Sequence, residues 1–179
     1  SNTYPQVNPD DLGAQMENNA SKFGPSTGND RIILLEDTNK DGIAESSRII
    51  ADKLLIPAGV APDNRGGCFV GASTELLHLS KPGEDGLLSE RRILFSGFGT
   101  EDTHHIIHSL HWGVDGRLYF HQTIYIHSHI ETPWGLIRAN SGAAFAYDPE
   151  SERLEVHSKG LVNAWGQQED LSGQTFLTS

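Results

Sequence analysis

A repeated pair of short apolar strands, separated by a polar turn, constrains the fold of this sequence more than any other feature. Three copies follow one another along the chain, at 32–35 with 48–51, at 76–79 with 92–95, and at 144–147 with 153–156. A second kind of strand pair follows the first two copies, at 60–61 with 68–70 and at 110–112 with 117–120. Short apolar runs bounded by Gly, Pro and Asp predict antiparallel hairpins, and two hairpins per repeat predict four strands.

The spacing of equivalent residues indicates how the repeats are built. Ile49 and Ile93 are 44 residues apart, whereas Ile93 and Leu154 are 61 residues apart. A propeller blade of four strands takes about 40 to 50 residues, so the longer interval indicates an insertion on one blade. The sequence therefore predicts an all-β fold, a β-propeller of four-stranded antiparallel blades, present as a fragment of about three to four blades.

Residues 1–179 are expected to form one partial β-propeller domain in which neither end completes a blade. Residues 8–30 are polar and rich in turn-forming residues, which predicts a long loop. Residues 121–140 are the insertion, and connections on a rigid scaffold often carry function. Residues 3–5 and 174–178 have strand composition and are expected to be strands of incomplete blades.

The charge distribution argues against a nucleic-acid partner. The chain has 13 Lys and Arg against 24 Asp and Glu, a net charge of −11, and no basic cluster larger than the pair Arg91 and Arg92. Such a chain repels a phosphate backbone and an anionic membrane surface. No apolar run is long enough to span a bilayer, and no signal peptide is recognisable, so any export signal or anchor is expected outside these residues. A small or neutral partner is expected.

An acidic turn between the first two predicted strands has the spacing of a calcium loop. Oxygen-bearing side chains occupy the alternate positions Asp37, Asn39 and Asp41, and Glu45 follows three residues after Gly42. A hard cation requires such ligands, and the glycine lets the chain turn sharply. Arg48 stands where an EF-hand has its last Glu, so the loop is not a complete EF-hand. The spacing predicts one calcium ion, and the alternative is an Asp-Gly hairpin turn with solvated carboxylates.

Histidines are concentrated in the middle of the chain. Eight of the nine lie between His78 and His129. Within the insertion, polar residues at odd positions from Tyr125 to Glu131 alternate with Ile124, Ile126, Ser128 and Ile130. An extended backbone would place the polar set on one face. We predict a catalytic group of histidines that transfers protons or binds a transition metal, at His104, His105, His127 and His129. The alternative for any single histidine is a structural, hydrogen-bonded residue.

Aromatic and acidic residues near these histidines are candidates for substrate binding. Aromatic rings stack on the apolar faces of sugars, and carboxylates accept hydrogen bonds from hydroxyls. The candidate residues are Tyr125, Glu131, Trp134 and Trp165. Packing between strands is the alternative role for the two tryptophans.

Five segments in the same order resemble the family of membrane-bound dehydrogenase domains that is related to the glucose/sorbosone dehydrogenases. They are residues 3–7, 35–42, 97–105, 124–135 and 160–166. The resemblance covers nearly the whole chain. It implies a quinoprotein-type β-propeller, a periplasmic or extracellular location with a membrane anchor in parts not present here, and a cytochrome c domain outside this chain.

Residues 105–116 also resemble a signature of the soluble glucose dehydrogenases that use pyrroloquinoline quinone. That signature is a His, a short gap, a Leu, an aromatic residue and Gly-Pro-Asp-Gly. The resemblance implies that His105 is the catalytic base and that the redox group is pyrroloquinoline quinone or a His-bound transition metal. Val162 stands where that family has a quinone-binding Arg before an Asn, which here is Asn163.

Two functions are compatible with these observations. The first is an exported sugar or polyol/aldehyde dehydrogenase-like propeller, whose His-rich central site takes a hydroxyl proton from a small sugar-like substrate. The alternative is a non-redox propeller that binds carbohydrate or acts as a metal-dependent lyase or hydrolase. The missing Arg and the surplus of histidines favour this alternative.

Overall fold

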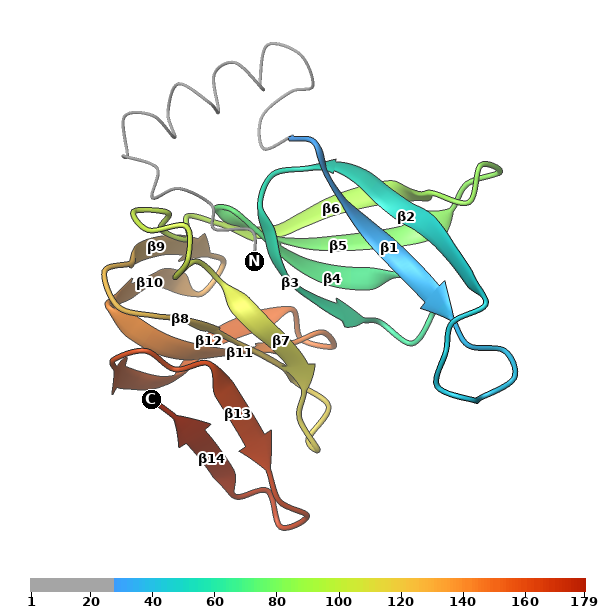
Figure 1. Ribbon diagram of the computed structural model, residues 1–179. Coiled ribbons are helices and arrows are strands. Elements are labelled where there is room, and N and C mark those ends of the chain that lie inside the picture. The colour runs from blue at the N-terminus through green and yellow to red at the C-terminus, as the bar shows by residue number, and fades with distance from the viewer. Residues whose placement is uncertain (1–27) are drawn as a thin grey trace.

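The computed structural model describes residues 28–179, which form an all-β fold (Figure 1). This part of the chain contains no helix, and hence none long and apolar enough to cross a membrane. The strands are β1 (Asp30–Glu36), β2 (Ser46–Leu54), β3 (Pro57–Pro62), β4 (Cys68–Ala72), β5 (Glu75–Pro82), β6 (Leu88–Ser96), β7 (His108–Trp112), β8 (Leu118–Gln122), β9 (His127–Thr132), β10 (Gly135–Asn140), β11 (Gly142–Asp148), β12 (Arg153–Leu161), β13 (Gly166–Glu169) and β14 (Thr175–Thr178).

The strands form two four-stranded antiparallel sheets and three hairpins. The sheets have the orders β3-β4-β5-β6 and β12-β11-β8-β7, and the hairpins are β1–β2, β9–β10 and β13–β14. The strand pairs predicted from the repeats are therefore confirmed: β1 with β2, β3 with β4, β5 with β6, β7 with β8, and β11 with β12. Within residues 28–179 the sheets do not close into a ring.

The first strands of three successive units run in the same direction. Gly59 near the start of β3 approaches His108 at the start of β7, and the indole N–H of Trp112 at the end of β7 donates to the carbonyl of Pro62 at the end of β3, at 2.7 Å. Figure 1 shows the arrowheads of β3, β7 and β13 at the same end. The turns 63–67, 113–117 and 148–152 form this end, which we call the turn end. The connections 97–107, 123–126 and 162–165 form the opposite end, which we call the histidine end.

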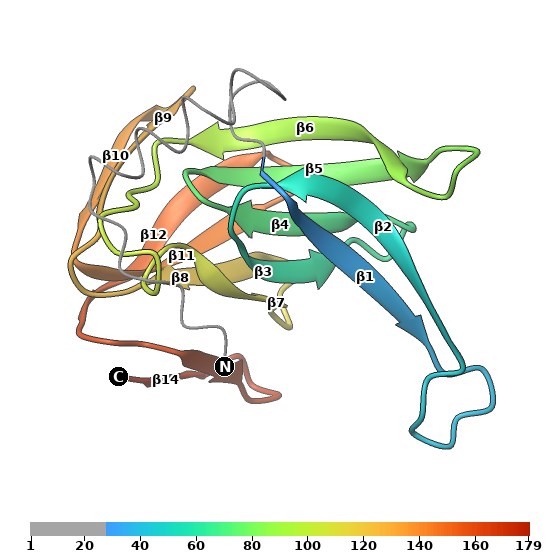
Figure 2. The same cartoon turned by 45° about the horizontal axis from the view of Figure 1, so that its top comes forward.

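The main core lies between the two four-stranded sheets (Figure 2). Phe98 makes edge-on contacts with Phe120 and Phe145, at ring-centroid distances of 5.7 and 5.6 Å. Every residue of β4 and β8 is buried, so these strands are covered on both faces. A smaller core joins β2 to the outer face of β4 and β5. An apolar sheet face must be covered by another layer, so the two sheets stack. This stacking fixes the positions of the turn end and the histidine end.

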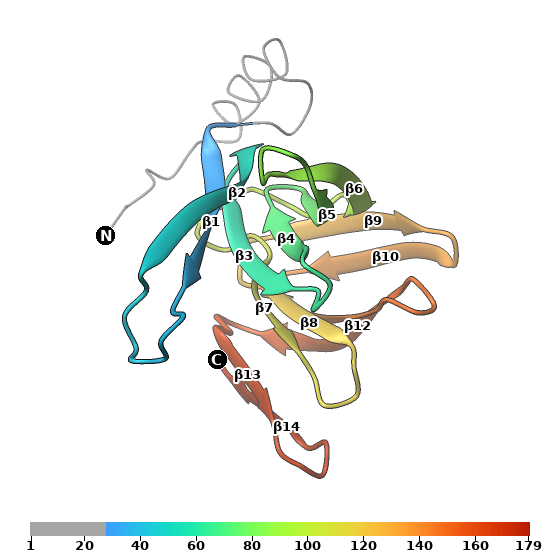
Figure 3. The ribbon, with the colours of Figure 1, turned by 90° about the vertical axis from the view of Figure 1, so that its right-hand side faces the viewer.

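The insertion contains a hairpin that does not interrupt the sheet. β8 pairs directly with β11, and β9–β10 projects from the connection between them. Figure 3 shows this hairpin between β6 and β12, which belong to different sheets. Ile130 and Ala139 fix it there, because both are buried in the main core.

Two sequence-based expectations fall partly or wholly outside the described residues. Residues 3–5 and most of the predicted loop 8–30 lie outside them, while Asp30 already begins β1. The predicted strand at 174–178 is confirmed as β14, which pairs with β13.

Candidate functional site

The connection between β6 and β7 is held along β9 by main-chain contacts. The amide of His129 donates to the carbonyl of Gly97 at 2.8 Å, and the amide of Gly99 donates to the buried hydroxyl of Ser128 at 3.0 Å. Gly97 has φ of +99°, and a Cβ there would collide with the carbonyl of His129. Only glycine fits this position without strain. The approach places the following residues, His104 and His105, beside the hairpin.

His105 is held in one tautomer by its surroundings. Its Nδ1 lies 3.0 Å from the carbonyl oxygen of Ile124 and 3.5 Å from the carboxylate of Asp102. Both neighbours can only accept, so Nδ1 carries the proton and Nε2 keeps its lone pair. The ring stacks on Tyr125 at 6.0 Å and its side chain is 16% exposed. An oriented imidazole whose Nε2 has no hydrogen-bond partner among residues 28–179 is what a general base or a metal ligand requires.

Asp102 binds both neighbouring histidines. Its Oδ1 accepts the main-chain N–H of His104 at 3.0 Å and lies 3.1 Å from the ring Nδ1 of the same residue. Burial by itself would raise the pKa of Asp102, but the hydrogen bonds from His104 and the proximity of the two imidazoles lower it. Asp102 therefore stays ionised and can stabilise a positive charge on His105.

The exposed face of β9 carries the other predicted histidines. His127, His129 and Glu131 are exposed, while Ser128 and Ile130 between them are buried, so the predicted alternation is confirmed. Nδ1 of His127 lies 3.2 Å from the carboxylate of Glu101, which links it to the same connection as His104 and His105.

The four predicted histidines are not gathered into a metal site. Among residues 28–179, the only group of three or more His, Cys, Asp or Glu whose ligand atoms lie within 4.8 Å of one another is in the β1–β2 turn. The arrangement at the histidine end therefore fits proton transfer by separate, oriented imidazoles better than three-ligand metal coordination.

The predicted substrate-binding residues are spread over the histidine end and the hairpin. Tyr125 stacks on His105, and Trp165 stacks on His108 at 4.3 Å with the rings nearly parallel. Trp134 lies in the turn between β9 and β10, at the far end of the hairpin from Tyr125. A strand of this length spans about 20 Å, so Trp134 is separated from the histidines of the connection.

Sequence reasoning missed a buried polar cluster beneath Trp165. His108 and His121 are almost fully buried and face each other across β7 and β8, with ring centroids 6.0 Å apart. Nε2 of His121 lies 2.9 Å from Oε1 of Gln167, on β13. Burial, together with His121 and His105, lowers the pKa of His108 to about 4. His108 is therefore neutral at physiological pH.

Several polar atoms of this cluster have no protein partner. They are Nε2 of His108, Nε2 of His111, Nδ1 of His121 and Nε2 of Gln167. Buried polar atoms are normally hydrogen-bonded, so ordered water is expected among them. No local sequence pattern predicts this cluster. The register of the β7–β8 pair shifts between His108 and His111, and this shift determines which imidazoles face each other.

The predicted calcium residues lie in the turn between β1 and β2, at the turn end. Carboxylate oxygens of Asp37, Asp41 and Glu45 lie within 4.8 Å of one another, and all three residues are exposed. Main-chain amides already bind them: Gly42 donates to Asp37 at 2.8 Å, and Thr38 donates to Glu45 at 2.7 Å. Asn39 accepts the amide of Asp41 at 2.8 Å. The geometry is compatible with both the calcium loop and the metal-free Asp-Gly turn.

A cavity of about 810 Å³ lies at the turn end and does not coincide with the histidine end. We place the candidate site at the histidine end because the oriented imidazole and carboxylate are there, and a large cavity by itself supplies no chemistry.

Fold and site together define an all-β protein of stacked antiparallel sheets with a histidine-rich end. The chain belongs to the family described as Domain of unknown function (DUF7133), since a model of that family matches residues 1–179. No curated protein and no solved structure matches the chain.

Proposed function

We propose that residues 28–179 are consecutive blades of a β-propeller. Two complete meanders of four antiparallel strands support the proposal, and both have the strand order of a propeller blade. β3 and β7, the first strands of these meanders, lie beside each other and run in the same direction, as innermost strands of adjacent blades do. The hairpins β1–β2 and β13–β14 would be the outer and inner halves of two further blades.

The histidine end would be the substrate site of an exported, dehydrogenase-like protein that acts on a sugar, polyol or aldehyde. The observation that carries the proposal is the hydrogen bond from Nδ1 of His105 to the carbonyl of Ile124, which leaves Nε2 free. In this role, Nε2 takes the proton of a substrate hydroxyl. The carbon that bears this hydroxyl loses a hydride, so the C–O bond becomes a carbonyl. Asp102 then balances the charge of the imidazolium.

The residues at this end do not fit the quinone of the soluble glucose dehydrogenases. Val162, at the position of the quinone-binding Arg, has an exposed apolar side chain, and its main-chain groups bind Ile124 and Ser179. A valine offers no charge-assisted hydrogen bonds to an anionic quinone. The hydride would therefore pass to another two-electron acceptor, such as a diffusible quinone.

The valine at position 162, in place of the quinone-binding Arg, favours a second candidate function. A general base without a built-in redox group suits a lyase or a hydrolase as well as it suits a dehydrogenase, and an imidazole can also hydrogen-bond a carbohydrate in a protein that only binds it. The candidates share His105 and a sugar-like ligand, and they differ in whether the ligand is oxidised, cleaved without oxidation or only bound.

The test compares three forms of the protein in sugar and polyol turnover with a redox dye as the acceptor. His105→Gln should lower turnover by about two to four orders of magnitude, because the base is lost. His157→Gln is the matched control, since His157 is exposed on β12 and lies outside the site. Equal activity of His105→Gln and the parent chain would refute the base assignment.

The choice between the two candidates depends on the fate of the electrons. Conversion of the sugar without reduction of the dye would select the non-redox candidate. Elemental analysis with an absorbance spectrum would detect any bound metal or quinone.

A further inference from the structure

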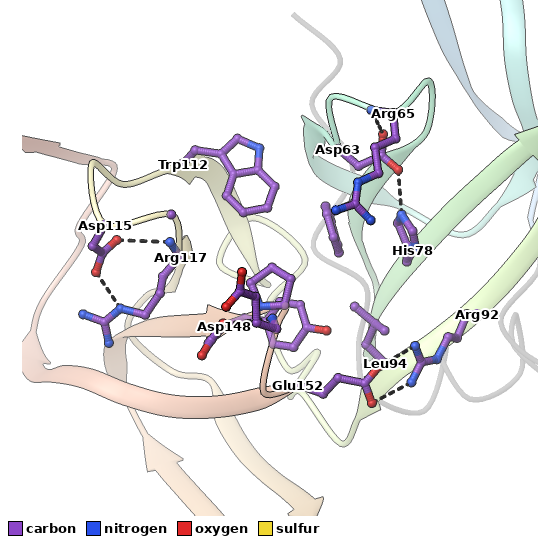
Figure 4. Close-up of a pocket in the computed structure, with 15 residues that line it drawn as sticks. Asp63, Arg65, His78, Arg92, Leu94, Trp112, Asp115, Arg117, Asp148 and Glu152 are labelled. Carbon is purple, nitrogen blue, oxygen red and sulfur yellow. Dashed lines mark hydrogen bonds and ion pairs between the residues drawn. The ribbon is translucent and has the colours of Figure 1, made fainter.

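The cavity at the turn end has the size and walls of a small-molecule site. Its volume of about 810 Å³ lies within the range of about 300 to 1,000 Å³ that is usual for such sites. Its walls come from the two four-stranded sheets and from the turns 63–67, 113–117 and 148–152 (Figure 4). The histidine end lies at the opposite ends of the same strands, so the cavity is separate from the site described above.

Most charged side chains around the cavity already pair with one another. Three pairs surround it: Arg92 with Glu152 at 2.7 and 2.9 Å, Arg117 with Asp115 at 2.6 Å, and His78 with Asp63 at 2.8 Å. Figure 4 shows these pairs on different sides of the opening. Each guanidinium and carboxylate keeps further N–H groups or lone pairs after pairing. The rim therefore offers adjacent donors and acceptors with much of its charge neutralised.

Arg65 lines the cavity but belongs to none of these three pairs. Its main-chain N–H donates to Asp63 at 2.8 Å, which fixes the β3–β4 turn, whereas its guanidinium has no hydrogen bond or ion pair with another residue of 28–179. Figure 4 shows the guanidinium pointing from this turn toward the cavity. Glu150, in the turn 148–152, also lines the cavity and supplies a compensating negative charge.

Trp112 gives the cavity an aromatic wall with a fixed orientation. Its indole N–H donates to the carbonyl of Pro62 at 2.7 Å, and the ring packs edge-on against Phe69 at 5.5 Å. A ring held in this way loses little conformational entropy when a ligand stacks on it. Tyr147 also lines the cavity, and its ring packs edge-on against Phe69.

We propose that this cavity binds a neutral saccharide. Each sugar hydroxyl both donates and accepts, which matches neighbouring guanidinium and carboxylate groups, and the apolar face of the ring matches Trp112. A charged ligand would instead have to break one of the three pairs or face charges of both signs. Arg65 donates to the ring hydroxyls, and the paired residues supply the acceptors.

The experiment follows the indole and main-chain amide signals of the protein by nitrogen–proton NMR during titration with glucose, xylose, cellobiose and maltose. At least one of these sugars should shift the Trp112 indole signal and the Arg65 amide signal in a saturable way. Arg65→Ala should weaken that binding by about tenfold, because charge-assisted hydrogen bonds are lost. Trp112→Phe keeps an aromatic ring and should weaken binding less than Trp112→Ala does.

Two controls separate this site from the histidine end. Arg138→Ala removes an exposed arginine of β10 that does not line the cavity, and His105→Gln alters the opposite end, so both should keep the saturable shifts of the Trp112 indole and the Arg65 amide. Absence of saturable shifts with all four sugars would overturn the proposal. So would shifts confined to Trp165, which would place sugar at the histidine end, or binding of acetate in place of neutral sugars, which would make the cavity an anion site.

Discussion

At the residue scale, two histidines three positions apart have opposite properties because their surroundings differ. His105 is partly exposed, and its Nδ1 lies 3.5 Å from Asp102, a carboxyl whose pKa is lowered. His108 is buried between Trp165 and His121, and its pKa is lowered to about 4 because burial penalises the charged form. The first is suited to accept a proton, and the second is suited to remain neutral.

This difference predicts how stability depends on pH. The unfolded chain binds a proton at His108 below about pH 6.5 and the folded chain only below about pH 4, so this residue should lower the free energy of unfolding as pH falls through that window. The full loss is about 3 kcal/mol. His108→Phe keeps a ring against Trp165 but cannot titrate, so its unfolding free energy should fall less between neutral pH and about pH 4.5.

Urea unfolding of both forms at the two pH values measures this effect. Identical pH dependence in His108→Phe and the parent chain would show that His108 is not buried in its neutral form.

At the element scale, most candidate residues lie on turns, connections and hairpins, and the sheets hold these elements in place. The β9–β10 hairpin leaves the ladder between β8 and β11 intact, so the scaffold tolerates it as an addition. The β1–β2 turn likewise projects from a regular antiparallel pair and brings three carboxylates together. Such elements can gain or lose a ligand without a change of fold.

The β1–β2 turn predicts stabilisation by calcium. A cation would offset the repulsion between Asp37, Asp41 and Glu45, and a ligand at a hundred times its dissociation constant adds about 2.7 kcal/mol. Calcium should therefore raise the melting temperature of the parent chain, and EDTA should reverse the effect. Asp41→Asn should abolish the response. Asp85→Asn, in the β5–β6 turn, should retain it, because that turn lacks the ligand spacing. A melting temperature that does not respond to calcium would leave the metal-free Asp-Gly turn as the correct description.

At the scale of the whole molecule, the outermost hairpins expose apolar side chains. Ile33 and Leu35 of β1 are more than half exposed, and so is Phe176 of β14. Among the described residues, β1 pairs only with β2 and β14 pairs only with β13. Exposed, apolar strand edges favour pairing with another strand, which agrees with the proposal that these hairpins are halves of incomplete blades.

The edges predict self-association of the 179-residue chain. Ile33→Lys places a charge on the exposed β1 edge and should reduce the associated fraction in light scattering at a given concentration. Leu171→Lys is the matched control, because Leu171 is fully exposed in the turn between β13 and β14 and not on a strand edge. A monodisperse monomer for the parent chain would contradict the open-edge interpretation, and a closed ring in its crystal structure would refute the predicted number of blades.

The sequence by itself determined the strands of the repeats, their pairing within five hairpins and the alternation in β9, whereas the pairs β9–β10 and β13–β14 appeared only in the structure. These features follow from local periodicity and turn chemistry, which neighbouring residues carry. Tertiary structure decided which histidine is oriented and which is buried. The carbonyl of Ile124 reaches His105 only through the β8–β9 connection, and Trp165 reaches His108 only because β13 runs beside β7. Contacts between residues far apart in the chain depend on register, bulges and sheet stacking, which no local pattern encodes.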